Sequence, residues 1–214
     1  TALIREETAG GVEGVIKRCT GEFACPYQKV EHLKHFVSRR AFDIEGLGDK
    51  QIEFFFTDPD LPVKSPADIF TLARRDAGNL KKLKDKEGFG ETSAAKLFAA
   101  IEAKRAIGLD RVIYGLGIRH VGESTAKTLA RFFGALDPLM EADESILQQV
   151  PDIGPVVARR ILHFFAEPHN REVIAKLRSN GVHWPESLPQ RSSEGPLAGL
   201  SMVLTGGLAS MSRD

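Results

Sequence analysis

The chain has 214 residues, of which 42% are hydrophobic, and 29 Lys and Arg residues balance 29 Asp and Glu residues to give no formal net charge. This length supports one core of about 150 residues with small additions, and the balanced charge excludes a basic tail or a polybasic membrane anchor as the main feature. No apolar run approaches the ~18 residues that span a membrane, and two cysteines cannot form a disulfide scaffold, so we expect a cytoplasmic protein with no membrane partner.

Four regions follow one another along the chain. Residues 1–30 are rich in Gly and Thr and contain short β-like pieces, whereas residues 31–185 carry apolar residues at spacings of three and four, which predicts helices. Residues 186–196 are typical of a flexible linker. Residues 197–214 contain a predicted strand over 200–205, and one strand cannot bury both faces. We therefore expect a fragment that stops inside a domain.

The zero net charge hides a basic segment. Between Gly78 and Met140 there are eleven Lys and Arg residues against seven Asp and Glu residues, so this stretch is positive and the remainder negative. A local positive excess can follow phosphate groups, although ordinary solvated helix surface explains it as well.

A repeat occurs four times in the helical region. An apolar residue precedes a glycine in Leu47-Gly48, Phe89-Gly90, Val121-Gly122 and Ile153-Gly154, at intervals of 42, 32 and 32 residues. Four places after each glycine, an amphipathic helix continues through Ile52, Ala94, Ala126 and Ala158. Four copies predict duplicated structural units.

The residue types of the repeat suit a tight turn between two helices. Glycine accepts a positive φ, and without a Cβ its backbone can approach another molecule closely. The N–H groups lie beside the start of the second helix, where unpaired donors and the helix dipole favour an anion. Each unit would then bind phosphate without recognising bases; the alternative is a helical hairpin in which glycine only caps a helix.

We expect the DNA contacts to come from the four turns and the helices that follow. The candidates are Gly46, Leu47, Gly48, Gly88, Phe89, Gly90, Thr92, Lys96, His120, Val121, Gly122, Ser124, Lys127, Ile153 and Gly154. The hydroxyls could cap a helix or reach phosphate, and for each lysine a solvated role is equally plausible. The fourth turn is the weakest candidate, because Asp152 would repel a phosphate unless it turned away to cap the helix. No residue is assigned a catalytic role.

These units resemble helix-hairpin-helix motifs of DNA-binding and repair proteins, and the order of features resembles the C-terminal half of bacterial NAD-dependent DNA ligases. The resemblance is carried by residues 18–21 with Cys25, then 33–41, 43–48, 115–123 and 150–155, and by 197–206, which looks like the opening strand of a BRCT domain. It implies a mainly α fold: a tandem helix-hairpin-helix domain with four hairpins, preceded by a small zinc-finger remnant in residues 1–30 and followed by a truncated BRCT strand.

The resemblance also implies a function. Such ligases seal nicks during DNA replication and repair: a lysine in a Lys-x-Asp-Gly motif takes AMP from NAD, with a divalent metal such as Mg. That motif is absent from these 214 residues, so we expect the chemistry elsewhere in the parent protein and no activity from this part alone. The expected partner is nicked double-stranded DNA, bound by a monomer near the nucleoid of a bacterium.

Zinc is the remaining cofactor that the resemblance implies. Cys19 and Cys25 match the second pair of a four-cysteine zinc finger, and two thiolates do not complete a tetrahedral structural site. His32 and His35 could complete a Cys-x5-Cys-x6-His-x2-His set, but the family pattern does not favour it. We therefore expect an incomplete zinc site in this chain.

Two other functions remain open at this point. One is another tandem helix-hairpin-helix module of DNA repair or recombination. The other is a helical protein-interaction module, for which the zero net charge is the best support. Salt-dependent binding to nucleic acid would separate the latter from the DNA-binding functions.

Overall fold

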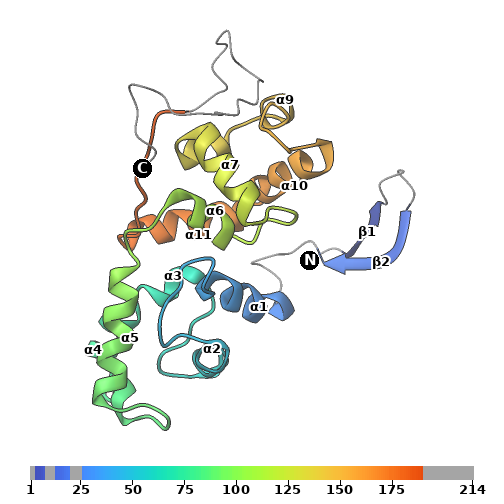
Figure 1. Cartoon of the computed structure of the whole chain (residues 1–214). Helices are drawn as coiled ribbons and strands as arrows, with labels where there is room; N and C mark the ends of the chain where they lie inside the picture. Colours follow the sequence, from blue (N-terminus) through green and yellow to red (C-terminus); the bar gives the residue numbers. More distant parts are fainter. Residues whose placement is uncertain (1–2, 8–12, 20–25, 190–214) are drawn as a thin grey trace, which may run out of the picture.

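The computed structural model describes the backbone of residues 3–7, 13–19 and 26–189, and the side chains of residues 28–189 (Figure 1). The strand predicted over 200–205 lies outside these residues, as do Cys25 and most of the predicted linker. Nothing in the described part therefore tests the BRCT-like strand.

Two short strands lie in the N-terminal region where β-like pieces were expected. β1 (Leu3–Glu7) pairs antiparallel with β2 (Glu13–Cys19), with Leu3 opposite Cys19 and Glu7 opposite Glu13. The register shifts between Arg5 and Glu7, as at a β-bulge.

The rest of the described chain is mainly helical, which confirms the predicted fold class. The first group of helices comprises α1 (Pro26–Val37), α2 (Asp49–Thr57), α3 (Pro66–Ile69), α4 (Leu72–Gly78), the short 3₁₀-helix η2 (Leu83–Asp85) and α5 (Glu91–Ala103). The second group comprises α6 (Leu109–Gly115), α7 (Glu123–Phe133), α8 (Leu136–Met140), α9 (Glu144–Leu147), α10 (Pro155–Ala166) and α11 (Pro168–Ser179). Figure 1 shows the first group in the lower part of the molecule and most of the second group above it.

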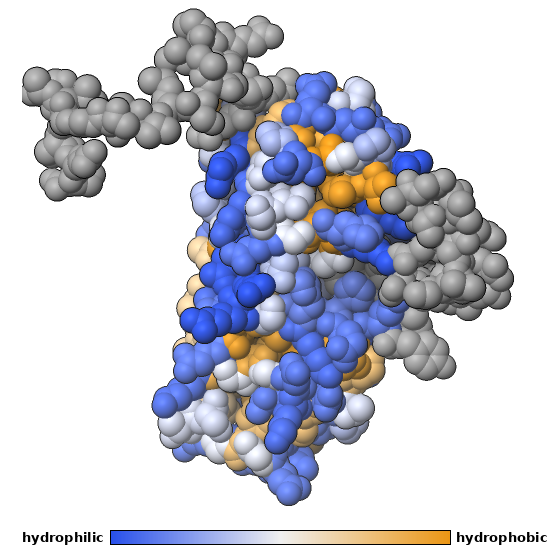
Figure 2. All heavy atoms as spheres, turned by 45° about the vertical axis from the view of Figure 1, so that its right-hand side comes forward, coloured by the Kyte–Doolittle hydropathy of each residue, from blue (hydrophilic) through white to orange (hydrophobic). Residues whose placement is uncertain are grey.

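One continuous hydrophobic core joins the two groups. The rings of Phe36 and Phe42 stack with their centroids 4.0 Å apart, and Phe70 meets the Phe42 ring edge-on. A Cβ on Gly115 of α6 would lie 3.2 Å from the Phe42 ring, so the two helix groups approach closely here. On the face shown in Figure 2, hydrophilic residues predominate and hydrophobic ones gather in an upper and a lower patch.

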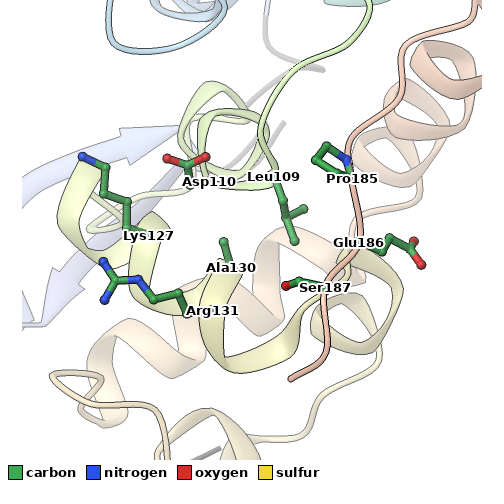
Figure 3. A pocket seen from close by; sticks show the side chains of 8 residues that line it. All are labelled: Leu109, Asp110, Lys127, Ala130, Arg131, Pro185, Glu186 and Ser187. Atoms are coloured by element: carbon green, nitrogen blue, oxygen red, sulfur yellow. The ribbon is translucent and has the colours of Figure 1, made fainter. Parts of the chain in front are cut away.

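The chain after α11 returns across the second helix group. His183 donates its N–H to Arg105 O at 2.8 Å, and Ser187 donates its N–H to Gly134 O at 2.9 Å. Trp184 is buried, with the Arg178 guanidinium 5.1 Å from its ring centroid. Figure 3 shows the hollow between this returning segment and helices α6 and α7. Ser187, within the stretch predicted as linker, thus still contacts the helical part.

A buried ion cluster fixes the segment before α5. The Lys86 ammonium lies 2.7 Å from Asp58 Oδ2 and 2.6 Å from Asp60 Oδ2, and the side chains of Lys86 and Asp58 are each only 6% exposed. Asp58 also accepts the N–H groups of Asp60 and Leu61. Lys86 is one of the eleven cations counted between Gly78 and Met140, but Asp58 and Asp60 neutralise it, so it adds nothing to the positive surface charge of that segment.

Removing the Lys86 charge should destabilise the fold. Lys86→Met leaves the Asp58 carboxylate buried without its cation, so we expect the free energy of unfolding to fall by about 3 kcal/mol. Urea denaturation followed by circular dichroism measures this change. The exposed Lys84, 3.7 Å from Glu91, supplies the control, and Lys84→Met should change stability by less than about 0.5 kcal/mol. Equal effects would contradict the role of the buried cluster.

The same cluster predicts a pH dependence. Burial tends to raise the pKa of Asp58, but hydrogen bonds from Lys86 and from the Leu61 and Asp60 amides outweigh it and lower the pKa. A lowered pKa means that this stabilisation is present above the ordinary pKa of an aspartate and is lost as the pH falls through the folded-state value. The difference in the free energy of unfolding between the native chain and Lys86→Met should therefore shrink as Asp58 is protonated in acid. If this difference stayed the same at a pH low enough to protonate Asp58, the prediction would be contradicted.

Candidate nucleic-acid interface

The four repeated segments fold into turns with the same backbone, which we call turn 1 (44–48), turn 2 (86–90), turn 3 (118–122) and turn 4 (150–154). The third residue of each has a positive φ: 81° at Gly46, 82° at Gly88, and 64° at both His120 and Asp152. The fourth residue donates its N–H to the carbonyl of the first, in Leu47 to Ile44, Phe89 to Lys86, Val121 to Ile118 and Ile153 to Val150, at 3.0–3.2 Å. A positive φ at the third position with this bond is the pattern of a type II turn.

The fifth residue of each turn is the glycine that begins the following helix. Gly48, Gly90, Gly122 and Gly154 accept the first helical hydrogen bonds, from Ile52, Ala94, Ala126 and Ala158, at 2.9–3.0 Å. None of these four N-cap glycines supplies a side chain to satisfy the N–H groups of the first helical turn. In turn 2, Ser93 Oγ accepts the Gly90 N–H at 2.8 Å, so that amide has a partner within the chain.

The apolar residue of each turn anchors it to the core. Leu47, Val121 and Ile153 are buried, and the half-buried Phe89 ring lies 5.3 Å from Phe54 and 5.8 Å from Phe55 between centroids. Only the backbone of Leu47, Val121 and Ile153 could therefore meet a ligand. Their side chains determine where the turn lies.

The glycines of the turns border open space. A Cβ added to Gly88, Gly90, Gly122 or Gly154 would meet nothing within 4 Å, and at Gly48 the nearest atom is Gln51 Oε1 at 3.5 Å. The φ of Gly122 is −83° and that of Gly154 is −86°, values that any residue adopts. The fold itself thus places no steric demand for glycine at these two positions.

Turns 3 and 4 place a residue with a side chain in the left-handed region. This conformation costs a non-glycine residue about 1 kcal/mol. Asp152 is not the N-cap of the following helix, because that position of α10 is Gly154, with no side-chain hydrogen bond. Asp152 is exposed instead.

The polar side chains predicted to contact DNA near the turns are exposed, but one of them already has an ion-pair partner. Thr92, Ser124 and Lys96 are exposed on the first turns of α5 and α7 or just beyond. The Lys127 ammonium lies 2.8 Å from Glu123 Oε1, so the lysine makes an ion pair within its own helix. Lys127 is therefore not a free cation in this structure.

The arginines around turn 3 were missed as site residues. Arg40 Nε lies 3.9 Å from Glu123 Oε2, although the two residues are far apart in the sequence. Burial and, to a smaller extent, the positive charge of Arg160 on α10 lower the pKa of Arg119 in turn 3. The Arg39-Arg40 pair was visible in the sequence, but only the folded chain brings Arg40 to α7.

Of the zinc ligands considered from the sequence, only the two alternative histidines, His32 and His35, have described side chains. His35 Nε2 donates a hydrogen bond to Tyr114 O at 2.7 Å, and burial, with a smaller effect of His35, lowers the pKa of His32 to about 4. Within residues whose side chains are described, no group of three or more His, Cys, Asp or Glu residues is placed to hold a metal. The Cys19 side chain and Cys25 lie outside that part, so their zinc role stays a prediction.

No helix in the described ranges is long and apolar enough to cross a lipid bilayer.

The turns do not form one compact cluster. Turn 2 lies at the lower end of the molecule where α5 begins, and turn 3 lies in the upper part before α7 (Figure 1). The arrangement suits contacts spread along an extended partner.

Comparison with known proteins places these turns in context. Residues 111–174, which include turns 3 and 4, match a family model described as a helix-hairpin-helix motif. This confirms the predicted motif there, and turns 1 and 2 share its backbone geometry.

Similarity to complete proteins extends over the whole chain. The chain is 57% identical to a DNA ligase of Chelativorans sp. (strain BNC1), with 100% of this chain and 32% of the relative aligned. It is 53% identical to a DNA ligase of Parvibaculum lavamentivorans, over 92% of this chain and 29% of the relative, and 50% identical to one of Agrobacterium fabrum, over 98% and 30%. The chain is similar to one part of these DNA ligases. It spans about a third of the length of these curated relatives.

The left-handed residues give a test of the shared turn geometry. Asp152→Gly should raise the free energy of unfolding by about 0.5 kcal/mol, because relief of the left-handed strain exceeds the entropic cost of glycine. The reverse change at the matched position of turn 2, Gly88→Asp, should lower it by about 1 kcal/mol. Thermal and urea denaturation measure both variants. A destabilising Asp152→Gly would show that Asp152 has a favourable contact that outweighs its strain.

Proposed function

We propose that this chain is the non-catalytic, DNA-binding part of an NAD-dependent DNA ligase, and that its turns hold the phosphate backbone of duplex DNA near a nick. The observation that carries the proposal is the set of four turns with one backbone geometry, each followed by a helix whose N-cap is a glycine, exposed in turns 1, 3 and 4 and half-buried in turn 2. The similarity to proteins named DNA ligase supports the assignment to a ligase.

The chemistry of the turns fits phosphate better than bases. Backbone N–H groups at a helix N-terminus, with no side chain in front of them, favour an anion. Contacts from backbone amides to phosphate oxygens carry no sequence information, so binding would be independent of base sequence. Such binding suits an enzyme that must act at any nick.

The four turns would not contribute equally. Thr92 and Ser124 add hydroxyl donors beside turns 2 and 3. In turn 4 the first helical residue is Pro155, which has no N–H, and the exposed Asp152 adds negative charge. Turn 4 would therefore bind phosphate most weakly and serve mainly to support its neighbours.

The catalytic steps would belong to the part of the parent protein that this chain does not span. On this proposal, NAD and a divalent metal such as Mg act there, and this chain alone seals no nicks. Cys19 and Cys25 would supply two of the four ligands of a structural zinc, the others coming from the parent. The proposed setting is the cytoplasm of a bacterium, where a monomer acts at the nucleoid in DNA replication and repair.

The proposal predicts strongly salt-dependent binding to DNA. With about six phosphate contacts, the affinity for a labelled nicked duplex should fall about a thousandfold between 50 and 200 mM salt, whatever the base sequence. Fluorescence anisotropy measures the dissociation constant at each salt concentration. Absence of binding at 50 mM salt would contradict the proposal and favour a protein-interaction module.

A substitution at a turn can separate binding from folding. Gly122→Asp places a carboxylate where the proposal puts a phosphate, yet Asp is a favoured N-cap and the added Cβ meets nothing within 4 Å. We therefore expect unchanged or higher thermal stability and an affinity for duplex DNA at least about tenfold weaker.

Ala135→Asp is the matched control, because Ala135 is the N-cap of α8, has no side-chain cap and lies outside the four turns. It adds the same charge and should change DNA affinity by less than about twofold. Equal losses of DNA affinity in Gly122→Asp and Ala135→Asp would mean that the added negative charge alone weakens binding and that turn 3 does not contact DNA.

A further inference from the structure

A charged hollow of about 540 Å³ lies beside turn 3. It is lined by four cationic side chains, Arg39, Arg40, Arg111 and Lys127, and by two carboxylates, Asp110 and Glu123. These residues come from the segment after α1, from α6 and from the start of α7. The excess of cations makes the hollow suited to an anion.

Hydrogen bonds to the backbone hold one of the cations in place. Arg111 Nε donates to Ala41 O at 2.7 Å, and its Nη2 donates to Arg39 O. The guanidinium is thereby fixed between α6 and the segment after α1. Because Arg has five N–H donors in a rigid fork, these two bonds leave others for a ligand.

The Glu123 carboxylate already lies among these cations. Its Oε1 is 2.8 Å from Lys127 Nζ, and its Oε2 is 3.9 Å from Arg40 Nε. The Lys127 hydrogen bond and charge lower the pKa of Glu123, and the charges of Arg40 and Arg111 contribute further. The chain's own carboxylate thus takes the place that an anionic ligand would take.

These contacts are weak enough to exchange. Glu123 and Lys127 are each nearly half exposed, and Arg40 is more exposed still. Ion pairs of this kind contribute little to stability, since water solvates both partners. A phosphate from a polyanion held by the neighbouring Gly122 turn would compete effectively for the same cations.

We propose that Arg40, Arg111 and Lys127 form a phosphate-binding site beside turn 3, which Glu123 occupies in the free protein and a DNA backbone phosphate occupies in the complex. This inference rests on the proposed DNA-binding function and adds side-chain contacts to those of the turns. Glu123 acts as an internal competitor that weakens binding and makes it easier to reverse.

The test compares two glutamates in equivalent ion pairs. Glu172 on α11 lies 2.7 Å from Lys176, four residues later, as Glu123 lies 2.8 Å from Lys127. Glu123→Gln and Glu172→Gln therefore remove the same charge and the same type of pair. We expect Glu123→Gln to bind a labelled 20-bp duplex about fivefold more tightly at 50 mM salt, with a salt dependence steeper by about one phosphate contact. Glu172→Gln should stay within about twofold of the native chain.

A second variant tests the cation side of the site, so that the inference does not depend on the Glu123 substitution alone. Lys127→Met should weaken binding more in the Glu123→Gln background than in the native chain, because in the native chain Glu123 neutralises the lysine. Thermal melts of all variants check that they are folded. Equal effects of Lys127→Met in both backgrounds, or equal effects of the two Glu→Gln changes, would overturn the inference.

The outcomes also separate this inference from the proposed function. If the native chain fails to bind duplex at 50 mM salt, the proposed function fails and this inference fails with it. If the native chain binds and Gly122→Asp weakens binding, but Glu123→Gln behaves like Glu172→Gln, only the internal competitor is wrong.

Discussion

The structure depends on one backbone constraint, a left-handed residue followed by a buried apolar residue and a glycine. The positive φ reverses the chain, the N–H of the apolar residue closes the turn, and its side chain fixes the turn to the core. The glycine that follows is the N-cap of a helix and offers no side chain to the amides of its first turn. A helix N-terminus presented in this way is suited to an anion, and the chain builds the turn four times, although Pro155 removes one amide from the fourth.

Much of this arrangement could be predicted from the sequence, because the constraint leaves a local signature. The recurring apolar-Gly pairs located all four turns and the helices that follow them, and even His120 and Asp152 occupy the left-handed position that Gly46 and Gly88 mark. The prediction failed where distant segments meet. The charge count gave Lys86 the same weight as the other cations of residues 78–140, but it is buried against Asp58 and Asp60, and nothing local predicted that pairing.

The charges around turn 3 show the same limit. The sequence marked Lys127 as a candidate, and its partner Glu123 lies only four residues earlier, but it left Arg40 unassigned, which only the fold brings to Glu123. Tertiary contacts between residues some 80 positions apart leave no periodic signal. These tertiary contacts nevertheless decide whether a cationic side chain is available to a ligand. The zero net charge of the chain is therefore compatible with DNA binding, since the local placement of charge matters more than its sum.

The central claim is that backbone amides of the turns contact DNA, and amide chemical shifts test it most directly. Two-dimensional ¹H–¹⁵N spectra of the labelled chain, recorded with and without a nicked duplex at low salt, report on each N–H group separately. The account predicts that the largest shifts fall on Gly48, Gly122 and the first residues of α2, α5 and α7, with smaller shifts at Gly154. Large shifts confined to α11 and residues 182–187, with the turns unchanged, would contradict it.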